Sequence, residues 1–396
     1  MSELTFDVAI AGGGPAGAFL ALLLTRSGRR VLLLEASDTD KRKICGEYLC
    51  PKGVQLLREC GLERLLLGRP VRGMRLFSPK GIAVESRFPG AQAGLAIRRD
   101  LLDPALLLAA KEVGAEVKRG VRLESFSYSG GTWQLKAGAE KFQARVLVGA
   151  DGRHSFVARN LGVQETIPKN RRRVALHFFA RTEREAAELG EMHILKDGSY
   201  AGISPTGPHE LNVSLVCDAD KAKPGGRAAV EALLSQSAYL AGRFLPLPTD
   251  CTVSVAYPVS HQVHSRCGPT WALVGDAAGF LDPLTGEGIF QALSSSKLLA
   301  TRLREAFEGS SLSECLMAYS HDHDRAFGSK AAMNRFFQGL IRYPKACDWV
   351  GNRLRSSPAR ADAFIGIIGN VHSPARGIKQ MLFPFNSGKT TRQGQI

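Results

Sequence analysis

The chain opens with a short apolar run, a glycine-rich turn and a longer apolar stretch. Phe6–Ala11 is mainly apolar, which is typical of a buried parallel strand. The motif Gly12-x-Gly14-x-x-Gly17 follows, then an apolar helix that ends near Arg26. Val31–Leu34 is a second apolar run. The order strand, glycine turn, helix and strand predicts one right-handed βαβ unit.

The pattern changes in the middle of the chain. Short segments rich in β-branched and aromatic residues alternate with Pro, Gly, Asp and Asn, which predicts a mostly antiparallel sheet. These segments are Val71–Phe77, Val174–Ala180, Leu211–Val216 and Thr252–Tyr257. The pattern of buried strands and longer helices seen at the start of the chain also occurs further along. It predicts a helix at Arg99–Val113, strands at Val146–Gly149 and Ala272–Val274, and a helix from about Gly288.

These patterns predict an α/β fold with a discontinuous nucleotide-binding domain. We expect a doubly wound domain built from residues 1–70, 99–165 and 263–325. Strands at 71–98 and an antiparallel substrate domain at 166–262 are inserted into it. A C-terminal helical cap covers 326–385, and residues 386–396 are expected to be a disordered tail.

Composition indicates an ordinary globular protein with a strongly basic surface. The 396 residues are 44% hydrophobic and 22% charged, and the net charge is +15. This charge favours anionic ligands or surfaces, although we find no nucleic-acid-binding module. No apolar run has the length of a membrane-spanning helix and no basic signal segment opens the chain, so we expect a cytoplasmic protein.

The C-terminal helices leave two alternatives open. From about Ala326 onward, aromatic and basic residues are mixed, as in "NRFFQGLIRYPKACDWVGNRLRSS". One alternative is a packed cap with a solvated charged face. The other is a platform for peripheral contact with an acidic membrane or a lipophilic substrate.

The cysteines do not predict a metal site. There are eight, with no CxxC pair and no zinc-ligand spacing. In a cytoplasmic chain we expect reduced thiols and no metal.

The glycine motif and the acid after it predict a dinucleotide site. Gly12 allows a tight turn, Gly14 lets the backbone approach a pyrophosphate, and Gly17 lets helix and strand pack closely. The free N–H groups at the helix N-terminus favour phosphate. Glu35 ends the second strand about 20 residues further on, where it can accept hydrogen bonds from a ribose.

Three later motifs carry a family resemblance. They are "RRDLLDPAL" (98–106), "GADGRHSFVAR" (149–159) and "LVGDAAGFLDPLTGEGIFQAL" (273–293). With the N-terminal unit, they resemble the FAD-dependent superfamily of para-hydroxybenzoate hydroxylase and the geranylgeranyl reductases, over about residues 4–310.

The resemblance implies non-covalent FAD and a set of cofactor-binding residues. Arg99 would reach the phosphate–ribose region, Asp151 would serve flavin and a transient NAD(P)H, and Asp276 would bind the ribityl chain. Read singly, Asp151 is equally a turn residue and Asp276 a helix N-cap. The other implied cofactor residues are Gly12, Gly14, Pro15, Ala16, Gly17, Glu35, Cys45, Gly46, Gly275, Gly286, Glu287, Gly288 and Ile289.

The stretch "KICGEYLCPKG" (43–53) resembles a loop that borders the flavin in the geranylgeranyl reductase branch. Gly46 would then permit backbone approach to the ring, and Cys45 would be a wall of the pocket or a proton donor. Cys45 as an apolar filler and a Cys45–Cys50 disulfide are the alternatives. Pro283 would lie near the reactive flavin carbon.

The substrate wall departs from the reductase branch. Its Tyr-x-Trp-x-Phe-Pro segment corresponds here to "YAGISP", so Tyr200 is kept while Gly202 and Ser204 replace larger residues. A roomier pocket follows. We therefore expect Cys45, Gly46, Tyr200 and Pro283 in catalysis, and no clear acid or base among the histidines, which are His177, His193, His261 and His264.

The expected reaction is NAD(P)H- and oxygen-dependent hydroxylation of a lipophilic aromatic or polyketide-like small molecule by an FAD-dependent monooxygenase. Reduction of C=C bonds in a prenyl lipid or quinone is the first alternative. A non-catalytic, membrane-associated flavin-binding protein is the second. The sequence leaves the oligomeric state open.

Overall fold

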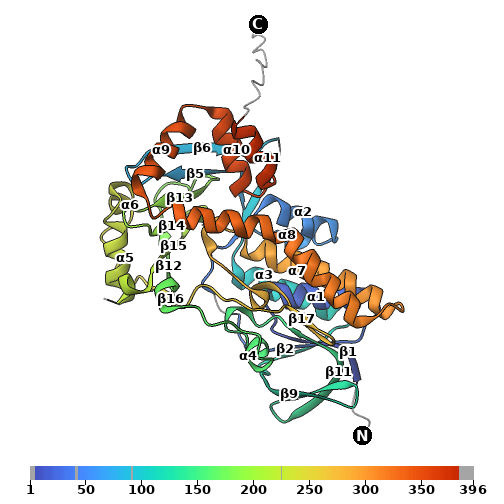
Figure 1. The fold of residues 1–396 in the computed structure, drawn as a ribbon. Helices are drawn as coiled ribbons and strands as arrows, with labels where there is room; N and C mark the ends of the chain where they lie inside the picture. The colour runs from blue at the N-terminus through green and yellow to red at the C-terminus, as the bar shows by residue number, and fades with distance from the viewer. Residues whose placement is uncertain (1–4, 41–42, 91, 224, 383–396) are drawn as a thin grey trace.

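The opening unit of the chain forms as the sequence predicts. The computed structural model describes residues 5–40, 43–90, 92–223 and 225–382 (Figure 1). Strand β1 (Thr5–Ala11) pairs in parallel with β2 (Val31–Glu35), and α1 (Pro15–Arg26) connects them. The predicted tail at 386–396 lies outside the described residues.

This unit belongs to an eight-stranded sheet whose path is β17-β18-β11-β1-β2-β8. β1 pairs in parallel with β11 and with β2, β2 pairs in parallel with β8, and β18 pairs in parallel with β11. A meander of β9 and β10 extends the sheet from β11. The remaining strands are β8 (Glu116–Arg119), β9 (Leu123–Ser129), β10 (Thr132–Ala137), β11 (Glu140–Gly149), β17 (Cys267–Gly268) and β18 (Trp271–Leu273).

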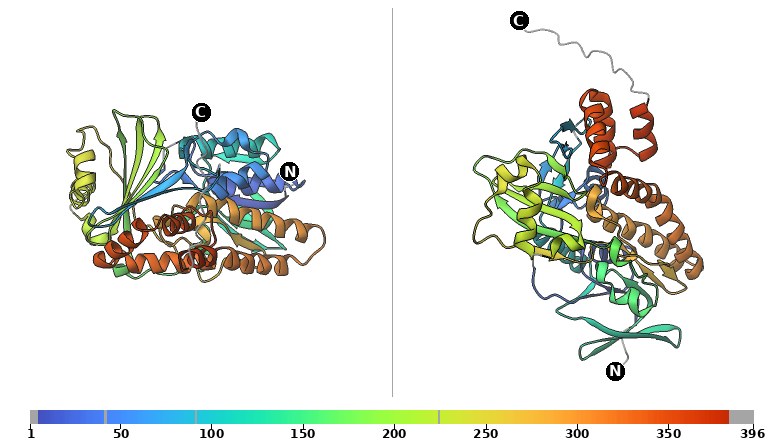
Figure 2. Two further views of the ribbon diagram at one scale, coloured as in Figure 1. Left: turned by 90° about the horizontal axis from the view of Figure 1, so that it is seen from above. Right: turned by 60° about the vertical axis from the view of Figure 1, so that its left-hand side comes forward.

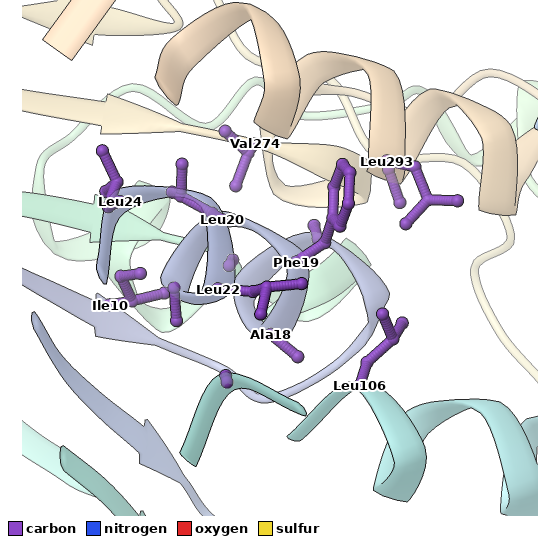
Figure 3. Packing of buried hydrophobic residues seen from close by; sticks show 14 of the residues in the cluster. Ile10, Ala18, Phe19, Leu20, Leu22, Leu24, Leu106, Val274 and Leu293 are labelled. Carbon is purple, nitrogen blue, oxygen red and sulfur yellow. The ribbon is translucent and has the colours of Figure 1, made fainter. Parts of the chain in front are cut away.

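Three helices cover one face of this sheet. α1 packs between α3 (Arg99–Glu112) and α7 (Gly288–Phe307), and its side chains Phe19, Leu20, Leu22 and Leu24 are fully buried (Figure 3). The helix is apolar on nearly all sides because it is enclosed by the sheet and by both neighbouring helices. The opposite face is covered by the β9–β10 meander and the short helix α4 (Phe156–Asn160).

The predicted inserted sheet has seven strands in the order β16-β12-β15-β14-β13-β5-β6. Its pairs are antiparallel except for β13 with β5. The strands are β5 (Gly73–Phe77), β6 (Ala83–Arg87), β12 (Arg173–Arg181), β13 (Gly190–Ile194), β14 (Tyr200–Gly207), β15 (Glu210–Asp218) and β16 (Ser254–Ala256). Helices α5 (Gly226–Leu234) and α6 (Ala238–Phe244) pack on its outer face.

One predicted strand is two strands in the structure. The expected run Val71–Phe77 divides between β4 (Arg69–Val71), in a three-stranded sheet, and β5, in the seven-stranded sheet. The chain changes sheets at Arg72, whose N–H donates to Glu188 O at 2.8 Å. Partners distant in sequence set this break, so a local pattern cannot reveal it. The other members of the small sheet are β3 (Tyr48–Leu49) and β7 (Gly94–Ala96).

The C-terminal part is helical, as expected, but its first helix begins earlier. α8 (Leu312–Leu340) runs through the predicted boundary at 325/326 and packs along α7 (Figure 2). Then follow α9 (Pro344–Arg355), α10 (Pro358–Ile368) and α11 (Pro374–Leu382). α9 and α10 pack against β6, and α11 packs on α10 and α8. α2 (Pro51–Glu59) packs on α7. Short 3-10 turns occupy Glu63–Leu65, Gly152–His154, Lys169–Arg171, Ala219–Ala222, Gly275–Ala278 and Pro283–Thr285.

Among the described residues, no helix combines the length and apolar character that crossing a bilayer requires. Within the same ranges, no cluster of three or more His, Cys, Asp or Glu side chains could hold a metal ion.

Candidate cofactor and substrate site

One cavity of about 700 Å³ joins the glycine turn to the inner face of the seven-stranded sheet. The structure brings most of the predicted site residues to its wall. They are Gly12, Gly14, Pro15, Ala16, Glu35, Cys45, Gly46, Arg99, Asp151, Tyr200, Asp276, Pro283, Gly286, Gly288 and Ile289. Three predicted residues, Gly17, Gly275 and Glu287, do not line the cavity.

The glycine turn has the geometry that the motif predicts. Gly12 has φ +106°, which favours glycine, and a Cβ on Gly17 would lie 1.9 Å from Gly12 O. Gly17 therefore serves close packing. A Cβ on Gly14 would meet only Arg99 Nη2, at 4.0 Å, so the space in front of Gly14 is open to a ligand. No side chain caps α1 at this end, which leaves its first N–H groups for a phosphate.

Glu35 lies at the cavity beside this turn. Its carboxylate accepts hydrogen bonds from Gly13 N at 2.6 Å and from Ser37 N at 2.9 Å. Two backbone donors fix the side chain and leave lone pairs free, because a carboxylate offers about four acceptor positions. The arrangement suits a ribose hydroxyl.

Arg99 is held at the cavity wall by a buried ion pair. Its Nε and Nη2 donate to Asp103 at 2.6 and 2.9 Å, and Lys43 donates to the same carboxylate at 2.9 Å. Burial opposes the guanidinium charge, but Asp103 raises the pKa of Arg99 above its usual value. The group is therefore a fixed positive charge at the place where the resemblance puts a phosphate.

The two aspartates of the later motifs differ. Asp151 accepts hydrogen bonds from Ser155 Oγ at 2.5 Å and from Phe156 N at 2.7 Å, so its carboxylate fixes the start of α4. This geometry favours the turn-residue alternative, and contact with a cofactor stays a prediction for Asp151.

Asp276 lines the cavity differently, because no donor within the described residues hydrogen-bonds to its carboxylate. Burial raises the pKa of Asp276, while Arg99 and Arg153 act against this. A polyol chain would supply the missing donors, so this residue fits a ribityl group. Gly275 beside it packs against α1, since a Cβ there would lie 2.8 Å from Ala16 Cβ.

The turn before α7 presents backbone to the cavity. Gly286 has φ +64°, and Gly288 and Ile289 line the cavity at an end of α7 that no side chain caps. Their N–H groups can therefore face an electron-rich ring. The Glu287 side chain points elsewhere and forms a buried ion pair with Lys330 of α8. Its predicted role is thus limited to its backbone.

Hydrogen bonds tie the Cys45 loop to the seven-stranded sheet and to the start of α3. Asn212 of β15 donates through Nδ2 to Cys45 O at 2.8 Å and to Glu47 Oε2 at 3.1 Å. Glu47 also accepts from Arg99 N at 3.0 Å and has φ +50°. A Cβ on Gly46 would meet nothing within 4 Å, so this backbone is open to a ligand.

Cys45 and Cys50 are both free thiols. Cys50 lies in a separate buried cluster and accepts from Asn370 Nδ2 at 3.6 Å. The disulfide alternative is therefore wrong for this structure. Burial raises the pKa of the Cys45 thiol, and Arg99 only partly offsets this, so the group is a neutral S–H at neutral pH.

Tyr200 lies at the other end of the cavity. Its hydroxyl donates to Asp282 Oδ1 at 2.5 Å, and the Arg173 guanidinium lies 5.2 Å from its ring centroid. Burial raises the pKa of the Tyr200 phenol, and the Asp282 charge raises it further. The phenol is therefore a neutral donor that fixes the residue preceding Pro283.

Sequence reasoning missed several residues of this site: Arg173, Asp282, Asn212 and Lys330. Asp282-Pro283 has the Asp-Pro pattern of a helix start, and Asp282 Oδ1 accepts from Leu284 N at 3.0 Å, so a local signal existed for this one residue. The other three act through distant partners that no local pattern shows.

The histidines named from the sequence lie outside the cavity wall. His193 pairs with Glu191 at 3.0 Å and stacks on Phe77, while His261 and His264 contact backbone carbonyls at 3.2 Å. These contacts are structural. His154 of the "GADGRH" motif does line the cavity.

The end of the cavity near Tyr200 is apolar and spacious. A Cβ on Gly202 would meet only Met192 Cε, at 4.0 Å, which supports the predicted roomier pocket. The apolar lining comprises Met74, Ala175, Met192, Ile203, Val216, Ala256, Val259, Phe280, Leu284 and Ile368.

Comparisons with known proteins identify relatives of this chain. A model of the family described as FAD binding domain matches residues 5–334. Conditioned medium factor receptor 1 of Dictyostelium discoideum is 28% identical over 390 residues, covering 90% of this chain and 75% of that protein. Digeranylgeranylglycerophospholipid reductase of Methanospirillum hungatei is 27% identical over 341 residues, covering 82% and 83%.

Menaquinone reductase of Mycolicibacterium smegmatis is 30% identical over 315 residues, covering 74% of this chain and 75% of that protein. Among solved structures, the flavin-dependent brominase Bmp2 has a TM-score of 0.80 at 21% identity, covering 96% of this chain and 98% of that one. At this identity the likeness establishes the fold alone.

Proposed function

Because this chain belongs to the FAD-binding-domain family of flavoproteins, we propose that it reduces carbon–carbon double bonds in an isoprenoid lipid or quinone. An FAD-dependent oxidoreductase is the broader class to which this reaction belongs. The names of two relatives, a digeranylgeranylglycerophospholipid reductase and a menaquinone reductase, support the substrate class. NAD(P)H is the reductant typical of such flavoproteins.

The described residues fit FAD along the whole cavity. Gly14 and the N-terminus of α1 would take the pyrophosphate, Glu35 the adenosine ribose and Asp276 the ribityl chain. Gly288 and Ile289 would face the ring. When bound and reduced, FAD supplies a hydride.

The Cys45 thiol is the observation that carries the proposal. Adding hydrogen to a double bond takes a hydride on one carbon and a proton on the other. Cys45 lines the cavity beside the open backbone of Gly46, and burial raises the pKa of its thiol. We expect the S–H to donate that proton, since it stays protonated at neutral pH.

The apolar end of the cavity suits a hydrocarbon chain. Met74, Met192 and Phe280 line it, and the polar Tyr200 hydroxyl is occupied by Asp282. Burying an isoprenoid chain there would cost little free energy, because the Tyr200 hydroxyl and the Asp282 carboxylate already hydrogen-bond to each other.

A second candidate is hydroxylation of a bulkier ring substrate by an oxygen-using FAD enzyme. The space beside Gly202 and the small Ser204 on β14 favour it, since a planar ring needs more width than a single chain.

A mass-shift experiment separates these reactions. FAD-loaded protein is incubated with NADPH and either a geranylgeranyl phospholipid or menaquinone, with and without air. We expect a product heavier by two hydrogens that forms equally well without air. A product heavier by one oxygen, formed only in air, would contradict the reductase and favour hydroxylation. If neither substrate oxidises the reduced flavin, the result would contradict the reductase and favour a non-catalytic flavin-binding protein.

Replacement of Cys45 tests the proton donor. We expect Cys45→Ala to lower turnover about 100-fold without a comparable change in FAD affinity. Wild-type turnover should hold at neutral pH and fall as pH rises beyond the usual thiol value of 9.0, because the donor then loses its proton. Cys60→Ala is the matched control, since Cys60 is another partly exposed free thiol that lies outside the cavity. Equal turnover in both variants would remove Cys45 from the mechanism.

A further inference from the structure

The outer face of α9 carries a stripe of basic and aromatic side chains. Lys345, Trp349 and Arg353 follow one another at four-residue spacing and are all exposed. The opposite face of the helix is buried through Cys347, Asp348, Gly351 and Leu354. Arg353 lies over the Trp349 ring, 5.4 Å from its centroid, while 62% of Trp349 stays exposed.

This part of the chain carries few carboxylates. From Arg335 to Ala363 the chain has two acids, Asp348 and Asp362. Asp348 accepts from Ser78 Oγ at 2.6 Å, and Asp362 accepts from Ser86 Oγ at 2.5 Å. Both serines belong to the β5–β6 region, so these acids hold α9 and α10 in place. Asp348 is buried, whereas Asp362 is exposed and is the one exposed acid between residues 335 and 363.

Further aromatic side chains extend this surface toward the end of α8. Phe336 is 64% exposed and Tyr343 is 69% exposed, and neither packs into an apolar core. Arg335, Lys345 and Arg355 are exposed along the same 21-residue stretch. We call Phe336, Tyr343, Lys345, Trp349 and Arg353 the basic aromatic surface.

This surface adjoins the apolar end of the cavity. Phe337 and Ile341, neighbours of Phe336 and Tyr343 in the chain, pack in one apolar cluster with Tyr200 and Leu284, which line the cavity. Side chains that pack against the cavity wall and exposed aromatic side chains therefore lie within one helical turn of each other.

We infer that the basic aromatic surface docks this protein on a bilayer containing anionic phospholipid. The negative potential of such a surface attracts cationic side chains, and Trp and Tyr favour the interface because their rings are amphipathic. A surface that binds only a soluble polyanion would leave the exposed Phe, Tyr and Trp side chains in water. The inference goes beyond the proposed reaction and does not depend on it.

A surface hollow gives the lipid phosphate a place. Trp349, Asn352, Arg353, Arg355 and Ser356 line a hollow of about 410 Å³ on α9. Two guanidinium groups and two neutral polar side chains meet there, which suits a phosphodiester with polar substituents.

Vesicle flotation with the full-length, FAD-loaded protein tests this inference. The vesicles are phosphatidylcholine alone or phosphatidylcholine with phosphatidylglycerol, at low and high salt. We expect binding to the anionic vesicles only, weakened by salt. The double variant Lys345→Gln/Arg353→Gln should lower the partition coefficient roughly 10- to 30-fold at low salt. Trp349→Ala with Tyr343→Ala should lower it about 10-fold and should reduce binding at high salt as well.

Matched controls remove the same kinds of side chain from surfaces outside α8 and α9. Tyr128 is 48% exposed on β9, at the end of the molecule opposite α9–α11 (Figures 1 and 2). Tyr128→Ala and the double variant Arg58→Gln/Lys141→Gln should leave vesicle binding within about twofold, and FAD absorbance reports that each variant is folded. No binding of the wild type, or equal losses in control and surface variants, would overturn the inference. Loss in the charge variant alone would also overturn it, because a purely electrostatic contact needs no aromatic insertion.

Discussion

The side-chain amide of Asn212 donates to Cys45 O at 2.8 Å and to Glu47 Oε2 at 3.1 Å. Asn212 lies on the seven-stranded sheet and is fully buried, while Cys45 and Glu47 belong to the loop after β2. Glu47 is itself fully buried and accepts from Arg99 N, at the start of α3. The Asn212 amide therefore ties the loop that borders the cavity to the seven-stranded sheet.

Asn212→Ala should destabilise the protein and loosen this loop. The substitution removes a donor from a buried carboxylate and from a backbone carbonyl, which costs about 2–3 kcal/mol in the free energy of unfolding. Urea unfolding monitored by circular dichroism measures this change, and flavin titration should show weaker FAD binding. Asn160→Ala removes a surface amide that donates to Phe156 O, and it should cost less than about 0.5 kcal/mol. Equal effects would show that the Asn212 contacts contribute nothing specific.

Gly14 and Gly17 should respond differently to alanine. A Cβ at Gly17 would lie 1.9 Å from Gly12 O, so Gly17→Ala should cost about 3 kcal/mol in stability despite the better helix propensity of alanine. A Cβ at Gly14 meets only Arg99 Nη2 at 4.0 Å, so Gly14→Ala should fold normally. It should nevertheless weaken FAD binding at least about tenfold, because the methyl group occupies the pyrophosphate's approach. Thermal unfolding of the apo protein and FAD titration separate the two effects; a fully stable Gly17→Ala protein would contradict the packing role.

The buried Lys330–Glu287 pair should behave as a unit. Lys330→Met leaves the Glu287 carboxylate buried without its cation, and we expect a loss of about 3–5 kcal/mol in stability. The double variant Lys330→Met/Glu287→Leu should recover most of that loss. Lys297→Met breaks an exposed pair with Glu59 at 3.1 Å and should cost less than about 1 kcal/mol. A double-mutant cycle by chemical denaturation measures the coupling, and additive effects would mean that the two groups do not interact.

His323 should make stability fall in acid. Burial lowers the pKa of this imidazole from 6.5 to about 3. Below pH 6.5 the unfolded chain binds a proton that the folded chain excludes, so stability is complete above 6.5 and is lost as pH falls toward 3. The loss should reach roughly 2–4 kcal/mol, and His323→Leu should flatten this part of the pH–stability curve. His321→Leu, at an exposed position of the same helix, should leave the slope unchanged. If the pH–stability curve of His323→Leu keeps its wild-type slope, His323 is not the group that causes the loss of stability in acid.

Local sequence patterns determined the parts of this protein that depend on near neighbours. The strand–glycine–helix–strand order fixed β1, α1 and β2, because Gly12 needs a left-handed backbone and Gly17 cannot carry a side chain. The alternating segments predicted β12 and β15 to within one or two residues. Most of the residues that the motifs predicted for the site also line the cavity, including Glu35, Arg99 and Asp276.

Only the tertiary structure decided what each charged group contacts. Asp151 and Asp276 both line the cavity, but the Asp151 carboxylate also accepts hydrogen bonds from the start of α4. Asn212, Arg173 and Lys330 lie more than forty residues from the partners Cys45, Asp282 and Glu287, as sequence separations of 167, 109 and 43 show. Such pairs form because burial makes an unpaired polar group costly, and which partner is near depends on how the two sheets and α8 pack.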